Sequence, residues 1–149
     1  MSKSKLKTLS NMPPITRNQE HFVIMTVIYD ELTDFVMGGG KTFRDVRELV
    51  EGVSGIPFEQ NSAYVQNTIA YALSHYGEIG KIFEPMLKDW SWNRLPLLTQ
   101  AILLMSYAHY KVENVDKSIV ISIAVDLAKK YIEPKQGKFV NAILDGALK

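Results

Sequence analysis

The chain has 149 residues, of which 46% are hydrophobic and 22% are charged, and these values are typical of one globular domain with a sizeable core. It contains no cysteine, which excludes a disulfide framework, a thiolate metal site and a cysteine nucleophile. The formal net charge is only +1, so a surface that binds anions must be a local patch. No apolar stretch is long enough to cross a bilayer of about 30 Å, and no secretory signal is recognisable. A cytoplasmic location without membrane contact is therefore expected.

The N-terminal region is predicted to contain a tail and then a long helix. Residues 1–14 are polar, carry lysines and end in two prolines, so a flexible basic tail is expected there, followed by one helical domain over residues 15–149. The first helix is expected to begin at a capping box formed by Thr16 and Gln19, whose side chains satisfy exposed backbone N–H groups. Apolar residues then recur at helical spacing until three glycines at positions 38–40, which end the helix.

The middle of the chain predicts two further helical regions. A second helix is expected to begin at Thr42 and to end at Gly52 or Gly55. A third helical region begins near Asn61, and its apolar positions keep the helical period as far as residue 87. Gly77 lies within this region and either interrupts the helix or is carried inside it.

The C-terminal half predicts three helices. Pro96 suits a first helical turn, and the very apolar helix after it is expected to be buried on most sides. Asp116 is placed to cap the next helix, which ends before Pro134. Its β-branched run at 118–123 is also compatible with a strand, but the apolar positions that follow favour a helix. With a last helix from about Gln136, the chain is predicted to be an all-α bundle of six or seven helices in one domain.

No motif predicts an active site. Residues 38–42 end like a phosphate-binding P-loop, but Phe35 stands where its first glycine is required, and the segment follows a helix rather than a strand. The three histidines, at positions 21, 75 and 109, include no pair with the spacing of metal ligands on a helix. We therefore expect no catalysis, no metal and no cofactor.

Two groups of basic residues suggest an anionic partner. One lies near the N-terminus and consists of Lys3, Lys5, Lys7 and Arg17. The other is C-terminal and consists of Lys129, Lys130, Lys135 and Lys138, beside Tyr131 and Phe139. Cations interleaved with aromatic rings suit single-stranded nucleic acid, because cations meet phosphates and rings stack on bases. A lysine-rich patch is also common on surfaces that bind nothing.

Three segments of the C-terminal half resemble the NusB family. They read NRLP followed by QAILLM at 93–105, AVDLAKKY at 124–131 and KFVNAILD at 138–145, and their order and spacing agree with the family pattern. The resemblance implies an all-helical, non-enzymatic transcription antitermination factor, either monomer or homodimer. Such a factor binds single-stranded boxA RNA of ribosomal RNA leader transcripts beside a small-subunit ribosomal protein, and acts on the RNA polymerase elongation complex indirectly.

The resemblance also implies roles for individual residues. The expected RNA contacts, from the first helix and the two C-terminal helices, are Arg17, His21, Lys129, Lys135, Lys138, Phe139 and Asn141. The expected contacts with the ribosomal protein are Tyr29 and His109. A structural interpretation is open for the last helix, in which Val140 and Ile143 are core residues, Asn141 caps a neighbouring turn and Phe139 also packs in the core.

The chain departs from the family pattern at several of these positions. Of an arginine-rich run in the first helix Arg17 remains, while Asn18 and His21 replace other arginines; Ser122 and Ile123 stand where the family usually has Asn-Glu. His109 stands at a glutamate position, so partner affinity is expected to vary between about pH 6 and 7.5. One alternative function is therefore a NusB-fold protein-interaction module that has lost boxA binding. Another, an RNA methyltransferase with a NusB-like domain, is disfavoured because no cysteine nucleophile is present.

Overall fold

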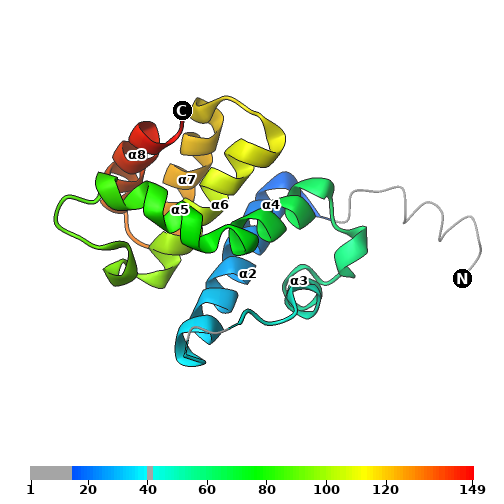
Figure 1. Ribbon diagram of the computed structural model, residues 1–149. Helices are drawn as coiled ribbons and strands as arrows, with labels where there is room; N and C mark the ends of the chain where they lie inside the picture. Colours follow the sequence, from blue (N-terminus) through cyan, green and yellow to red (C-terminus); the bar gives the residue numbers. More distant parts are fainter. Residues whose placement is uncertain (1–14, 40–41) are drawn as a thin grey trace, which may run out of the picture.

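The computed structural model describes residues 15–39 and 42–149, and over these residues the chain is all-helical (Figure 1). The α-helices are α2 Arg17–Met37, α3 Val46–Ser54, α4 Ala63–Ser74, α5 Tyr76–Phe83, α6 Leu97–Glu113, α7 Lys117–Tyr131 and α8 Gln136–Ala147. Short 3-10 helices lie at Phe58–Gln60, Glu84–Met86 and Trp92–Arg94. Within the described residues there are seven α-helices and no strand, which confirms the predicted class. The predicted basic tail and the P-loop-like residues 40 and 41 lie outside the described residues.

Local capping explains where two of the N-terminal helices begin. The Thr16 hydroxyl accepts a hydrogen bond from the Gln19 backbone N–H at 3.2 Å, and the Gln19 side chain accepts one from the Thr16 N–H at 2.7 Å. This confirms the predicted capping box. The prediction of Thr42 for the next helix is wrong, because the Asp45 carboxylate accepts from the Arg47 N–H at 3.0 Å and α3 begins at Val46. An aspartate at the N-cap also complements the positive end of the helix dipole.

Two positions that the sequence left open are settled by the structure. The helical region after Asn61 breaks at His75, whose N–H bonds the Tyr71 carbonyl, and Gly77 lies inside the following helix α5. The β-branched run at 118–123 is part of α7 and forms no strand.

Helix α6 is the centre of the bundle. Its residues from Thr99 to His109 are all buried, because α2, α4, α7 and α8 pack around it. Each fully buried aliphatic side chain, such as Ile102, contributes about 1.5 to 3 kcal/mol relative to an exposed one. Figure 1 shows α2 and α4 on one side of α6, with α7 and α8 on the other. None of the helices in the described part of the chain is long and apolar enough to span a membrane.

Candidate nucleic-acid interface

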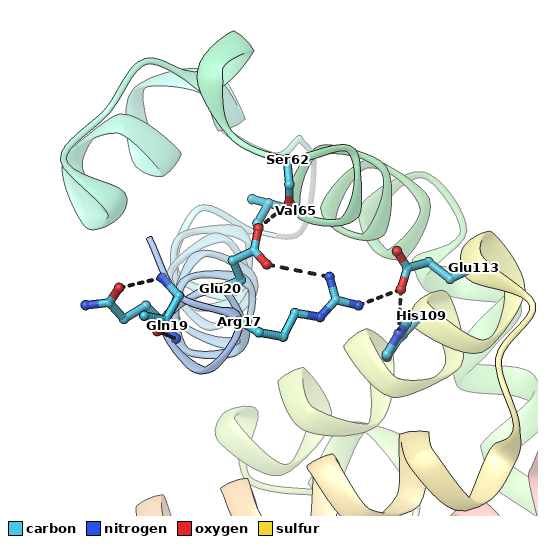
Figure 2. Close-up of polar contacts among 8 residues, drawn as sticks. Arg17, Gln19, Glu20, Ser62, Val65, His109 and Glu113 are labelled. Carbon is cyan, nitrogen blue, oxygen red and sulfur yellow. Dashed lines mark hydrogen bonds and ion pairs between the residues drawn. The ribbon is translucent and has the colours of Figure 1, made fainter. Parts of the chain in front are cut away.

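Arg17 lies at the junction of α2, α4 and α6, where it is held by other side chains (Figure 2). Its Nη2 donates to Glu113 Oε1 at 2.7 Å, and its Nη1 lies 3.5 Å from Glu20 Oε1. The guanidinium carbon stands 3.5 Å from the centroid of the Tyr64 ring, a cation–π contact. Two carboxylates therefore compensate the charge of Arg17, although 48% of its side chain stays exposed.

Glu20 and Ser62 join the first turn of α2 to the first turn of α4. The Ser62 hydroxyl donates a short hydrogen bond to Glu20 Oε2 and accepts one from the Val65 N–H at 3.3 Å. Ser62 therefore caps α4 and satisfies a nearly buried carboxylate at the same time. This contact fixes the start of α2 against α4, and with it the position of Arg17 (Figure 2).

His109 lies inside the bundle beneath this network. Its side chain is 3% exposed, and its Nε2 stands 2.9 Å from Glu113 Oε1. Burial lowers the pKa of His109 from its ordinary value of 6.5, although the hydrogen bond that Glu113 accepts and the charge of Glu113 act in the opposite direction. The variation of partner affinity between about pH 6 and 7.5 stays a prediction, and the lowered pKa favours its acidic end. The burial does not support a direct partner contact by His109, because the surface carboxylate at this place belongs to Glu113.

His21 is also nearly buried, with 9% of its surface exposed. Burial, together with the positive charge of Arg17, lowers the pKa of His21 to about 4. The imidazole is therefore neutral at physiological pH, and the expected contact of His21 with RNA stays a prediction in which the ring carries no positive charge. It packs edge-on against the Tyr64 ring, with centroids 5.8 Å apart, and its Nε2 has no hydrogen-bond partner among the described residues.

The predicted lysines at the turn between α7 and α8 are exposed. Lys129 lies near the end of α7, Lys135 directly precedes α8, and Lys138 lies in its first turn. The stem of Lys129 covers Gly137, where a Cβ atom would stand only 2.8 Å from Lys129 Cε. The absence of a side chain at Gly137 thus lets Lys129 lie along the seam between the two helices.

Other predicted contacts are dispersed around this seam. Phe139 is half-buried and lines a cavity of about 280 Å³ together with Trp90, whose ring is largely exposed. Asn141 is exposed on α8, and Tyr29 is exposed on α2. The place of Trp90 beside Phe139 was not predicted, since Trp90 lies in a connection far from Phe139 in the chain.

A groove also lies between the first turns of α2 and the last turns of α7, and we name it the α2–α7 groove. It holds two hollows, of about 220 and 330 Å³, which share Asn18, Lys130 and Tyr131. His21 and Asp126 line the smaller hollow. The structure therefore brings the reduced arginine motif of the first helix next to the C-terminal basic group.

Residues 40–149, which include every helix after α2, match the model described as the NusB family. The chain belongs to the NusB family. A transcription antitermination protein NusB of Thermoanaerobacter sp. (strain X514) is 36% identical over 88 residues, which cover 59% of this chain and 62% of that protein. The NusB protein of Helicobacter pylori (strain Shi470) is 37% identical over 90 residues, which cover 56% of this chain and 65% of that protein. The match thus spans less than two thirds of these curated relatives.

A solved structure extends the likeness to most of the chain. The structure described as antitermination factors NusB and NusE in complex with dsRNA matches with a TM-score of 0.70 and 26% identity, over 89% of this chain and 95% of that chain. The NusB family model begins only at residue 40, after α2.

Proposed function

We propose that this NusB-family protein is an RNA-binding transcription antitermination factor. The observation that carries the proposal is the row of exposed lysines at the α7–α8 turn. Lys129, Lys130, Lys135 and Lys138 are exposed, and none of them forms an ion pair with another described residue. Half-buried rings, those of Tyr131 and Phe139, lie within the same segment. Free cations beside aromatic rings are what a single RNA strand requires.

The RNA that we propose is of the boxA type, from the leader of ribosomal RNA transcripts. Lys129, Lys135 and Lys138 would meet phosphates, while Phe139 and Asn141 would contact bases. Arg17 would join them by exchanging Glu113 for a phosphate, because an exposed ion pair contributes only about 0 to 1 kcal/mol. The names of the curated relatives and of the structural neighbour with NusE and RNA support this proposal.

The protein partner that we propose is a small-subunit ribosomal protein, docked beside Tyr29 and the end of α6. His109 takes the place of the family's glutamate, but Glu113, one turn further along α6, is partly exposed and bonded to His109. Glu113 would therefore offer the carboxylate to the partner, with His109 positioning it from below.

Anisotropy of a fluorescein-labelled boxA 12-mer, compared with a scrambled 12-mer, tests the proposal. Four phosphate contacts imply a slope of log affinity against log salt near −3, at about −0.7 per contact, and hence a roughly 50-fold loss between 50 and 200 mM salt. Adding the purified ribosomal protein should tighten binding to boxA. Absence of binding to either RNA at 50 mM salt would refute RNA binding.

The charge state of the first helix favours one alternative, a protein-interaction module without RNA binding. Arg17 is compensated by two carboxylates, and His21 is neutral, so α2 offers little free positive charge. In that case the ribosomal protein binds with unchanged affinity in the presence and absence of RNA.

A further inference from the structure

The α2–α7 groove lies beside the proposed RNA-binding lysines, and of the expected RNA contacts His21 lines it. We propose that it binds two consecutive nucleotides of single-stranded RNA, and that its smaller hollow selects a base with an exocyclic amino group. This inference rests on the proposed function and names part of its specificity.

The smaller hollow has the size and chemistry for one base. Its volume of about 220 Å³ is below the roughly 300 to 1,000 Å³ of sites for drug-sized ligands. Apolar side chains of α7, Ile123 and Leu127, form part of its wall. Asn18, Asp126 and Lys130 supply polar groups from both helices. A flat apolar ring with a polar edge fits this combination.

The polar groups of the smaller hollow are available to a ligand. Asn18, Asp126 and Lys130 are exposed, and none of their side chains forms a hydrogen bond or an ion pair with another described residue. His21 also lines the hollow and adds the wall of a nearly buried, neutral ring.

Asp126 provides the selectivity. A carboxylate only accepts hydrogen bonds, and it pairs with an amino group such as N4 of cytosine. The corresponding edge of uracil carries a carbonyl oxygen, which a carboxylate repels. Asn18, which can both donate and accept, is able to satisfy the remaining polar atoms of the same edge.

The larger hollow fits the neighbouring nucleotide. It is lined by Phe22, whose ring is 39% exposed and stands 5.6 Å from the Tyr131 ring, so a second base can stack there. Lys130 lines both hollows, and its Nζ lies 5.3 Å from the centroid of Tyr131. The phosphate that links two bases placed in adjacent hollows lies between them, at the position of Lys130.

The network around Arg17 explains why Lys130 takes this role. Arg17 precedes Asn18 in α2, but its guanidinium turns toward Glu113 of α6 (Figure 2) and stands over the ring of Tyr64 of α4. Of the described residues that line the groove, Lys130 is therefore the one that offers a free cation, although no contact was predicted for it individually.

Anisotropy of the full chain with labelled oligo(rC) and oligo(rU) 12-mers, which carry equal charge, tests the inference. We expect oligo(rC) to bind at least fivefold more tightly. Asp126→Asn should bring the ratio of the two affinities close to one, because an amide can pair with either base. Lys130→Gln should weaken the binding of both RNAs alike and reduce the slope of log affinity against log salt by about 0.7.

Matched controls are Glu78→Gln and Lys81→Gln on α5, outside the groove, which should change neither the ratio nor the slope. Melting temperatures confirm that each variant is folded. Equal, salt-dependent binding of both RNAs, or a ratio that Asp126→Asn leaves unchanged, overturns the inference and leaves the proposed function standing. Failure of both RNAs to bind overturns both. If Asp126→Asn weakens only the binding of the ribosomal protein and leaves RNA binding unchanged, the groove is a protein interface and the inference is wrong.

Discussion

Replacing Glu31 with glutamine is expected to stabilise the protein at neutral and alkaline pH. Glu31 lies on the buried face of α2 and is 0% exposed, and neither carboxylate oxygen has a hydrogen-bond partner among the described residues. Burial raises its pKa to about 7, and the nearby backbone N–H of Arg44, followed by the charge of Arg44, opposes this shift without cancelling it. The folded protein therefore favours the protonated, neutral carboxyl group.

The sign and size of the effect follow from this shift. In the unfolded chain Glu31 titrates near 4.5. Below that pH both states are protonated and the group costs nothing, whereas stability is lost as the pH rises from about 4.5 through 7. A difference of about 2.5 pKa units, at 1.36 kcal/mol each, gives a loss of roughly 3 kcal/mol at pH 8. Glutamine is nearly isosteric and carries no charge, so it escapes this loss.

Urea unfolding at pH 4.5, 6, 7 and 8 measures the difference in free energy of unfolding between Glu31→Gln and the natural protein. The difference should grow from near zero to roughly 3 kcal/mol over this range. Glu51→Gln, on the exposed face of α3, is the matched control and should show a difference that stays near zero. The reasoning would be refuted if Glu31→Gln were less stable than the natural protein at pH 8. It would also be refuted if the difference in free energy of unfolding were the same at every pH, because burial would then not disfavour an ionised Glu31.

Three further predictions concern packing, acid stability and RNA stacking. Gly80→Ala should destabilise the protein by about 1 kcal/mol or more, because the added Cβ would lie 2.9 Å from Nε1 of the buried Trp92 ring. In the same helix, the Cβ added by Gly77→Ala meets nothing within 4 Å, so that variant should be more stable by about 0.4 to 1 kcal/mol. The melting temperatures of the two variants should therefore shift in opposite directions. Since the pKa of His21 is lowered from 6.5 to about 4, stability should fall as the pH drops through this window, and His21→Gln should flatten that fall in urea titrations. Phe139→Ala should weaken the binding of boxA RNA by about 1 to 3 kcal/mol without changing the slope of log affinity against log salt. If the folded fraction of this variant binds RNA normally while its melting temperature drops, Phe139 is a core residue only.

The sequence predicted those features that depend on neighbouring residues. The capping box at Thr16 and the start of α8 at Gln136 are encoded within one helical turn, and both are observed. The start of α3 was missed because two candidate caps, Thr42 and Asp45, lie three residues apart, and only the fold decides between them.

Long-range contacts were beyond the sequence. The residues next to Arg17 in the sequence do not predict its contacts with Glu113 and Tyr64. From the sequence Arg17 is therefore expected to be a free cation, whereas in the structure it is paired with other side chains of the protein. Likewise, the sequence of α6 does not show whether His109 faces solvent. Only the packing of the surrounding helices shows that His109 is buried in the bundle. The position of Lys130 between two hollows depends on how α7 crosses α2, which no local pattern reveals.

The ion pair between Arg17 and Glu113 joins residues that are 96 positions apart in the chain, and this separation has a consequence for synthesis. At about 5 to 20 residues per second, α6 leaves the ribosome roughly 5 to 20 seconds after α2. During that interval α2 lacks the helix that later packs along it, although α3 and α4 are already available as neighbours. The N-terminal helices therefore complete their packing only after α6 is made, and a nascent chain stalled before α6 would leave part of the apolar face of α2 uncovered.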